Sequence, residues 1–395
     1  MPDQRRRVLF VDHTAVLGGG ELALLALLRE LDRSLFDPVV LLLSDGPLIQ
    51  ELEGLAETHV LALPDEILKA RRDDLSSPGF LWTKLVIALR YLHSFSRLVR
   101  KLRPRLIHSN SLKADVLTGI VAAYSRIPQI WHIRDRISED YLPSSVVALF
   151  RIACQLLPNA LIANSRSTLE SLHLGSETVG VVISSGIDLK PFVDSKKREH
   201  FTLEQSSAAN PIQIGIIGRI CAWKGQDVFL RSAGIVHEFF PNAHYHIVGG
   251  PLFEELEFEK QLHDMAATLG LSRQVTFAGF RRDIPDYVSG LDIVVHASTI
   301  PEPFGQVIVQ GMAAGKPVIA TEGGGPSEIV EDGVTGFLVP RNNATALAGA
   351  IMHILNNPKA AQIVAERGQK EALQRYGSEI TTRKVEELYK ELLAG

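Results

Sequence analysis

The chain has 395 residues, of which 46% are hydrophobic and 22% are charged, and its formal net charge at pH 7 is −4. This length favours two domains over one core, and the weakly acidic balance argues against a nucleic-acid-binding protein, whose surface would be basic. The only cysteines, Cys154 and Cys221, lie far apart in the sequence. This argues against a disulfide framework and favours a reducing, cytoplasmic setting.

The first half of the chain alternates short apolar runs with helical patterns. The predicted strands are Val8–Asp12, Val39–Leu43, Arg105–His108, Gln129–His132, Ala160–Ala163 and Val179–Ile183, and the predicted helices are Glu21–Leu31 and Phe80–Leu102. Apolar strands separated by helices are typical of a parallel sheet that is covered on both faces. Asp12 and His13 interrupt the first apolar run too early for a signal peptide, and no apolar stretch is long enough to span a bilayer.

A polar segment, Asp194–Pro211, has no apolar period, and we interpret it as the connection between two domains. A second alternation follows it. Its predicted strands are Ile212–Ile217, His244–Val248, Gln274–Phe277, Ile293–His296 and Pro317–Ala320, and its predicted helices are Val228–Phe240 and one that ends near Leu269. We therefore predict two facing, doubly wound α/β domains, over residues 1–190 and 211–377, that bind a ligand between them at the carboxyl ends of their strands.

The loop over residues 298–306 carries the strongest candidate site. Glu302 lies in this loop, and Gln310 lies about one turn into the helix that follows. Helical side chains lean toward the helix N-terminus, so Gln310 can face the same ligand as Glu302. Gly305 allows close approach, and the amides of residues 304–306 favour oxygen acceptors. The alternative is an ordinary turn with a solvated Glu, because helix N-termini favour acidic residues.

A second candidate loop, Gly218–Gly225, directly follows a predicted strand and contains Arg219 and Lys224. Arg binds phosphate oxygens in a bidentate manner, and Lys acts as a point charge, so the loop suits a diphosphate. The alternative is a surface loop with two solvated cations.

Two further loops are rich in glycine. Gly18-Gly19-Gly20-Glu21 follows the first strand and suits a phosphate or a closely packed substrate, although a plain tight turn would also explain it. It is not a G-x-G-x-x-G motif, so the dinucleotide fingerprint is absent and a nicotinamide dehydrogenase is disfavoured. Gly323–Gly325 precedes a helix at Pro326 and is expected on the same sheet edge as the Glu302 loop, although structural capping of that helix would also explain it.

Two histidines, His108 and His132, end predicted strands and are expected at the carboxyl edge of the first sheet. A lone His at such a place is more often a structural hydrogen bonder than a catalytic group. A metal is not expected, because the sequence has no Cys/His cluster, no H-x-x-x-H and no Asp-x-Asp pair.

In their order along the chain, these loops resemble the motifs of glycosyltransferase family 4, the retaining enzymes of the GT-B fold. The matching segments also include Ser185–Asp188, Phe277–Phe280, Gly315–Val318 and Asp332–Val339. The resemblance implies transfer of a hexose-type sugar from a nucleotide diphosphate donor, with a UDP-sugar favoured. The acceptor would be a glycan or a lipid-linked molecule in polysaccharide or glycolipid synthesis, and neither cofactor nor metal would be needed.

Carried over position by position, the resemblance implies a set of roles. Gly19 and Gly20 would approach the phosphate, Gly218, Arg219 and Lys224 would hold the diphosphate, and Phe280 and Arg281 would line the base. Glu302 and the amides of Phe304, Gly305 and Gln306 would hold the transferred sugar, which His132 would face across the cleft. Glu302, His132, Arg219 and Lys224 would be the catalytic set, and a last helix, Ser378–Leu393, would return to the first domain.

One position departs from the family pattern, which has a second Glu eight residues after the first to hold the ribose hydroxyls. Gln310 stands there. A Gln accepts one hydrogen bond but loses a charge-assisted one, a loss of about 1–2 kcal/mol that affects donor affinity more than chemistry. Two alternatives therefore stay open: a UDP-sugar 2-epimerase of the same fold, and a non-catalytic nucleotide-sugar-binding protein.

The segment Phe80–Ala114 contains eight Lys and Arg residues and no acidic residue, with aromatic residues between them. A basic amphipathic helix of this kind can lie on an anionic lipid surface, which would place the protein peripherally at the inner membrane surface. The alternative is an ordinary surface helix packed on the sheet.

Overall fold

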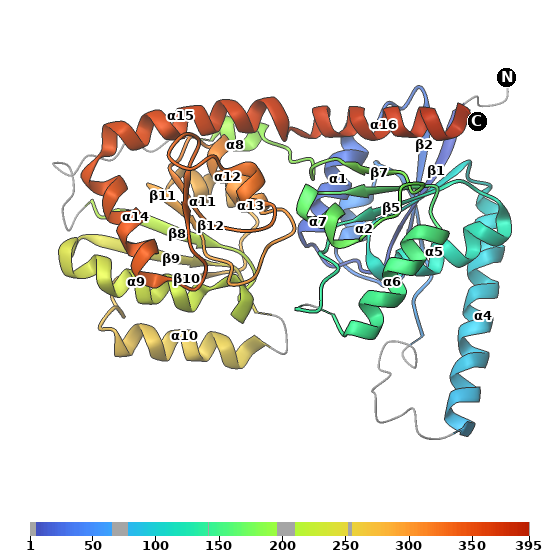
Figure 1. Cartoon of the computed structure of the whole chain (residues 1–395), viewed down its shortest axis with the longest axis horizontal. Coiled ribbons are helices and arrows are strands. Elements are labelled where there is room, and N and C mark those ends of the chain that lie inside the picture. Colours follow the sequence, from blue (N-terminus) through green and yellow to red (C-terminus); the bar gives the residue numbers. More distant parts are fainter. Residues whose placement is uncertain (1–4, 65–77, 141, 196–209, 252–254, 395) are drawn as a thin grey trace. The chain divides into compact units, whose positions relative to one another are not determined.

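The structure is a computed structural model that describes residues 5–64, 78–140, 142–195, 210–251 and 255–394. The chain divides into two compact units, residues 1–186 with 378–395 and residues 187–377. Each unit is built on its own parallel sheet (Figure 1). None of the described helices combines the length and the apolar character needed to cross a membrane.

The first unit contains a seven-stranded sheet in the order β3-β2-β1-β4-β5-β6-β7. Its strands are β1 Arg6–Asp12, β2 Phe36–Leu42, β3 Glu57–Val60, β4 Leu106–Ser109, β5 Gln129–Ile133, β6 Ala160–Ala163 and β7 Gly180–Val182. The chain builds outward from β1 to β3 and then returns to add β4 on the other side of β1. The boundary between β1 and β4 is therefore a topological switch point, where α/β sheets place their ligands.

Helices cover both faces of this sheet. They are α1 Gly19–Glu30, α2 Leu48–Leu52, α4 Pro78–Leu102, α5 Leu112–Ser125, α6 Ser144–Leu156, α7 Arg166–Ser171 and α16 Ser378–Ala394. Side chains alternate between the faces along each strand. In β1, Leu9 packs in the core that contains residues of α4 and α5, whereas Phe10 packs in the core beneath α1 and α16.

The second unit contains a six-stranded parallel sheet in the order β10-β9-β8-β11-β12-β13. Its strands are β8 Ile212–Ile217, β9 Ala243–Val248, β10 Val275–Gly279, β11 Ile293–His296, β12 Val318–Thr321 and β13 Phe337–Val339. Its helices are α8 Lys190–Asp194, α9 Gln226–Phe239, α10 Leu256–Thr268, α11 Ile284–Ser289, α12 Gln306–Ala313, α13 Pro326–Ile329, α14 Ala344–Asn356 and α15 Pro358–Arg375. The switch point here lies between β8 and β11.

The prediction of two Rossmann-like, doubly wound domains is confirmed. Two strands were missed, β3 and β13, each at the edge of its sheet. β3 has the sequence Glu-Thr-His-Val and is not buried, and β13 has only three residues, so neither gives an apolar run. Most of the polar segment that we interpret as the interdomain connection lies outside the described residues.

Candidate functional site

The first polar cluster lies at the carboxyl edge of the second sheet, beside its switch point. Glu302 is at its centre and is 8% exposed. Lys224 Nζ donates to Glu302 Oε1 at 2.6 Å, and His296 Nε2 and Ser298 Oγ lie 2.7 Å and 2.5 Å from Oε2. A carboxylate without a proton can only accept, so all three groups act as donors and hold its orientation.

Glu302 is ionised in this setting. Burial alone would raise the pKa of its carboxyl group, but attraction to Lys224 and His296 outweighs burial and holds that pKa well below its usual range. Glu302 is therefore a fixed negative charge and an acceptor of hydrogen bonds at neutral pH, with no proton to donate.

The glycine loop after β12 holds the Glu302 backbone in place. Gly325 N donates to Glu302 O at 2.8 Å, and Glu302 and Gly324 form an isolated parallel bridge. Gly324 has a φ of +71°, and a Cβ at this position would lie 2.2 Å from Glu302 O. A glycine is thus required here by both backbone conformation and space. The glycine loop was expected on the same sheet edge as the Glu302 loop, and the structure shows in addition that the two loops are in contact.

The two cations of the Gly218–Gly225 loop contact different carboxylates. Lys224 pairs with Glu302, and its Nζ also lies 4.4 Å from the centre of the Trp223 ring. Arg219 Nη2 lies 3.4 Å from a carboxylate oxygen of Glu255, with 43% of its side chain exposed. Exposed ion pairs contribute less than about 1 kcal/mol, so Arg219 can exchange Glu255 for a phosphate at little cost.

The remaining residues predicted for the donor lie on the same unit. Phe280 follows β10 and is exposed, and a Cβ on Gly250, after the adjacent β9, would lie 3.7 Å from Phe280 Cβ. Arg281 pairs with Asp283 at 2.6 Å. Gln310 is half-buried on α12.

Two residues that follow Glu302, Phe304 and Gly305, lead into α12. Gly305 has a φ of +100° and precedes the helix, whose first residue is Gln306. Phe304 is buried and packs against Tyr376, with ring centres 5.8 Å apart. The side chain of Phe304 therefore belongs to the core, and only its backbone is suited to the ligand role predicted for it.

A second polar cluster lies at the switch point of the first sheet. Asn110 Nδ2 donates to Asp12 Oδ2 at 2.6 Å, and Arg134 Nε donates to Asn110 Oδ1 at 2.7 Å. Arg134 Nη1 also donates to Ser185 Oγ at 3.1 Å. A Cβ on Gly20 would lie 3.3 Å from Arg134 Cδ, so a glycine at the start of α1 lets this arginine lie against it.

Two histidines and a tyrosine complete this cluster. His108 and His132 lie 3.1 Å apart through Nε2 and Nδ1, and His108 Nδ1 lies 2.5 Å from Tyr389 Oη. Each histidine is the next-to-last residue of its strand, not the last as predicted, and both are buried on the face that α1 and α16 cover instead of emerging at the sheet edge. Sequence reasoning assigned no role to Arg134 or Tyr389, and Tyr389 carries no local signal, since it is 281 residues from its partner.

Glu21 adds a titratable group to this cluster. Its Oε2 accepts from Gly18 N at 3.0 Å, which closes the first turn of α1. Burial and the neighbouring charge of Asp12 raise the pKa of Glu21 to about 7.

Among the residues that the structure describes, no group of three His, Cys, Asp or Glu side chains is arranged to hold a metal ion.

Comparison with known proteins gives matches along most of the chain. The pattern described as Glycosyltransferase Family 4 matches residues 17–190, and the pattern described as Glycosyl transferases group 1 matches residues 198–371. The D-inositol 3-phosphate glycosyltransferase of Corynebacterium urealyticum is 30% identical over an alignment of 375 positions, which covers 88% of this chain and 83% of that protein.

Two further similarities concern a lipopolysaccharide enzyme and a solved structure. The lipopolysaccharide core biosynthesis mannosyltransferase LpsB of Rhizobium meliloti is 27% identical over 241 residues, which are 60% of this chain and 66% of that protein. The crystal structure of Anabaena HepE in complex with UDP and glucose is similar with a TM-score of 0.82 at 27% identity, over 98% of this chain and 100% of that one. HepE is also known in complex with UDP-glucose.

Proposed function

This chain belongs to glycosyltransferase family 4 and has the GT-B fold, and we propose that it transfers a hexose from a UDP-linked donor with retention of anomeric configuration. Its place among group 1 glycosyltransferases makes it an enzyme of glycan or glycolipid synthesis.

The buried pair of Glu302 and Lys224 is the observation that carries the proposal. An ionised carboxylate fixed by three donors can accept hydrogen bonds from the hydroxyl groups of a sugar. The ammonium group 2.6 Å away attracts phosphate oxygens. A ligand with a sugar and a phosphate side by side matches both groups, and a nucleotide sugar is such a ligand.

We propose a front-face reaction for the transfer step. The bond from the anomeric carbon to the donor phosphate oxygen breaks, the bond to the acceptor oxygen forms on the same face, and the acceptor proton passes to the departing phosphate. Arg219 and Lys224 stabilise the negative charge that grows on this phosphate. Glu302 orients the sugar, and because entry and departure occur on one face, the configuration is retained.

Support for a UDP-linked donor comes from HepE, whose complexes contain UDP, glucose and UDP-glucose. The direct test is titration calorimetry with UDP, GDP and ADP, followed by incubation with a panel of UDP-hexoses and acceptor extract. We expect UDP to bind most tightly and the product to keep the donor's configuration, as read from its anomeric proton coupling. Free epimerised sugar nucleotide would indicate the epimerase, and a donor that binds but stays intact would indicate the binding protein.

The acceptor class is suggested by the outer layer of the first unit, which exposes much apolar surface. The exposed apolar side chains are Leu89 on α4, Val116, Ile120 and Tyr124 on α5, and Val146, Leu149, Ile152 and Leu156 on α6. The side chains of Tyr124 and Leu156 are 79% and 75% exposed. These helices cross the same face of the first sheet (Figure 1), and exposed apolar patches of this kind mark interaction surfaces.

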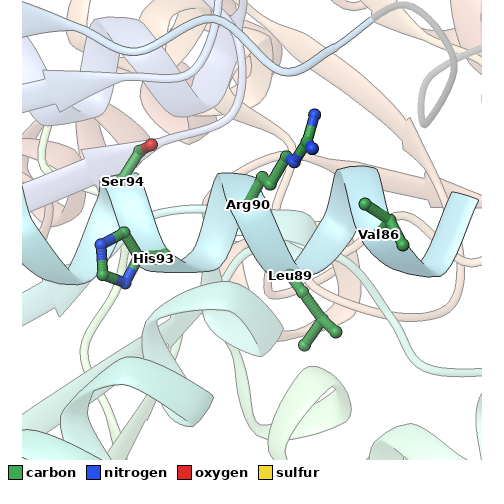
Figure 2. Close-up of a pocket in the computed structure, with 5 residues that line it drawn as sticks. All are labelled: Val86, Leu89, Arg90, His93 and Ser94. Carbon is green, nitrogen blue, oxygen red and sulfur yellow. The ribbon is translucent and has the colours of Figure 1, made fainter.

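Helix α4, which packs on the same face of the sheet, also carries positive charge. Arg90, Arg97, Arg100 and Lys101 are all exposed on α4. Figure 2 shows Arg90 and Leu89 projecting from α4, where an open hollow is lined by Val86, Leu89, Arg90, His93 and Ser94. Apolar side chains beside a basic helix fit an anionic lipid surface, so we propose peripheral membrane binding and a lipid-linked acceptor.

A further inference from the structure

His296 is the last residue of β11 and contacts Glu302 from the interior of the second unit. The side chain of His296 is 2% exposed and that of Lys224 is 18% exposed, although both contact the same carboxylate. Lys224 meets Oε1, whereas His296 and the buried Ser298 meet Oε2. The two oxygens of Glu302 therefore have different surroundings, because a ligand can reach the partner of Oε1 but not the partners of Oε2.

Thr321, the last residue of β12, limits where the protons of the His296 ring can lie. Its Oγ1 lies 2.8 Å from the carbonyl oxygen of Ser298. A carbonyl oxygen only accepts, so the single hydroxyl proton of Thr321 points at that oxygen. The same Oγ1 lies 3.4 Å from His296 Nδ1 and therefore presents only lone pairs to the ring.

Both ring nitrogens of His296 consequently face acceptors. Nε2 meets the Glu302 carboxylate, which has no proton to donate, and Nδ1 meets the lone pairs of Thr321. A neutral imidazole has only one N–H, so one of its nitrogens would turn a lone pair toward another lone pair. That arrangement is unfavourable here, since His296 and Thr321 are only 3% and 2% exposed. A ring with a proton on each nitrogen satisfies both contacts and is a cation.

The charges around His296 agree with a cationic ring. The loop after β11 provides the Glu302 carboxylate, 2.7 Å from Nε2, and the loop after β8 provides Lys224 on the other oxygen of that carboxylate. The neighbouring strand β12 provides Thr321, which has no charge. Among the described residues, the ion pairs of this cluster involve only these three charged groups. An adjacent carboxylate stabilises the charged form of an imidazole.

We propose that His296 is a positively charged positioning residue that stays paired with Glu302 when the donor diphosphate draws on Lys224. Two cations on one carboxylate leave an excess of one positive charge, so Lys224 can serve phosphate oxygens while the buried carboxylate keeps a cation. With a neutral residue at position 296, Glu302 and the phosphate would compete for Lys224. This inference rests on the proposed function, because the ligand is a diphosphate.

The charge of His296 can be read from the intact protein by long-range ¹H–¹⁵N NMR with ¹⁵N-labelled histidine. The chain has 13 histidines, and a His296→Gln spectrum assigns the resonances that matter. We expect both ring nitrogens of His296 to be protonated at pH 7, without UDP and with it. A ring with a single proton overturns the proposal, whether or not the protein transfers sugar.

His296→Gln separates the charge from the hydrogen bond, because its amide can donate to Glu302 Oε2 but has no charge. Glu302 should then attract Lys224 more strongly, so UDP should bind more weakly by about fivefold or more, whereas uridine, which has no phosphate, should bind as in wild type. In a Glu302→Gln background the same substitution should cause no further loss, because no charge remains at position 302. Equal losses in both backgrounds, or no loss in either, overturn the proposal.

Thr321→Val tests the proton on Nδ1, and it decides the matter where His296→Gln does not fold. Val has nearly the shape of Thr but no oxygen for the Nδ1 proton, so His296 should lose that proton at a lower pH than in wild type. UDP affinity should fall over the same pH range in which NMR shows the loss, and Thr321→Ser, which keeps the hydroxyl, should behave as wild type. Proton loss at an unchanged pH in Thr321→Val, or UDP affinity that does not follow it, overturns the proposal.

Failure of the proposed function has a different outcome. If the wild-type protein binds no nucleoside diphosphate and transfers no sugar from any donor, the proposed function fails. The NMR spectrum still shows whether His296 is charged in that case.

Discussion

At Glu302 a single carboxylate performs two tasks, since it holds Lys224 and is the expected acceptor for the sugar. Glu302→Ala should lower turnover by about 100-fold or more, because orientation of the sugar is lost in the transition state. UDP affinity should be kept or improved, since UDP lacks the sugar and Lys224 loses a competing carboxylate. Steady-state kinetics and calorimetry measure the two effects, with exposed Glu257→Ala on α10 as control.

Gln310→Glu should change nucleotide affinity, in contrast to the turnover effect expected at Glu302. A carboxylate at position 310 accepts from two ribose hydroxyls at once, so UDP should bind severalfold more tightly while kcat stays near the wild-type value. Gln310→Ala should weaken UDP binding. If Glu302→Ala turns over at the wild-type rate, these loops do not form the donor site. The same conclusion follows if neither substitution at position 310 changes UDP affinity.

The two cations of the Gly218–Gly225 loop should differ when each is replaced by Ala. Both variants should weaken UDP binding by about 2 kcal/mol, because each removes a phosphate contact. Lys224→Ala should also lower the melting temperature, since it leaves buried Glu302 without its ion pair, whereas Arg219 pairs at the surface and its loss should not. Arg231→Ala on α9, an equally exposed arginine, is the control, and unchanged UDP affinity in both variants would remove the clamp assignment.

Glu21 should make stability depend on pH. Its pKa is about 7 in the folded chain against an ordinary 4.5, so the folded state binds its proton more tightly and stability falls as pH rises from about 4.5 to 7. Glu21→Gln keeps an acceptor for Gly18 N and cannot ionise. The variant should gain about 3 kcal/mol over wild type above pH 7 and lose the advantage near pH 4. Denaturant unfolding at several pH values measures this. If the free energy of unfolding changes with pH in the same way in both proteins, the prediction is contradicted.

At the scale of elements, the sequence and the structure agree best where a motif lies between a buried strand and a helix. The loops around Lys224 and Glu302 could be found because an apolar run ends immediately before each of them. The donors His296 and Ser298 were not assigned, since a strand-end His and a loop Ser give no signal until the loop folds back on them. Tyr389 could not be found at all, because α16 has the pattern of any amphipathic surface helix.

Substitutions on α4 and α6 of the first unit test the proposed membrane binding. Leu149→Ser with Leu156→Ser removes exposed apolar area from α6, and Arg97→Glu with Arg100→Glu reverses charge on α4. Each pair should reduce sedimentation with phosphatidylglycerol vesicles by about tenfold, because hydrophobic insertion and electrostatic attraction both contribute. UDP affinity should not change in either pair. Arg231→Glu on the second unit is the control for net charge, and vesicle binding that survives both pairs would remove the membrane assignment.

At the scale of the whole molecule, alternation of apolar runs with helices was enough to predict two doubly wound domains. Buried parallel strands must be apolar on both faces, so β1, β8 and β11 are visible in the sequence. The sheet order and the contact of α16 with α1 depend on packing between segments hundreds of residues apart. Pattern reasoning does not reach such contacts, and the return of the last helix could be expected only from the family resemblance.

The charges of the molecule also predict whether a metal is needed. Nucleotide-sugar transfer requires positive charge where the diphosphate departs, and this chain provides it with Arg219 and Lys224 at one sheet edge, whereas its sequence has no Asp-x-Asp pair to hold a divalent ion. Turnover should therefore be the same in EDTA as with added Mg²⁺ or Mn²⁺. The assay uses the intact chain, a UDP-hexose that it accepts, and a metal-dependent transferase inactivated by the same EDTA as the control. Activity lost in EDTA and restored by Mg²⁺ or Mn²⁺ would show that the two cations do not suffice to stabilise the departing diphosphate.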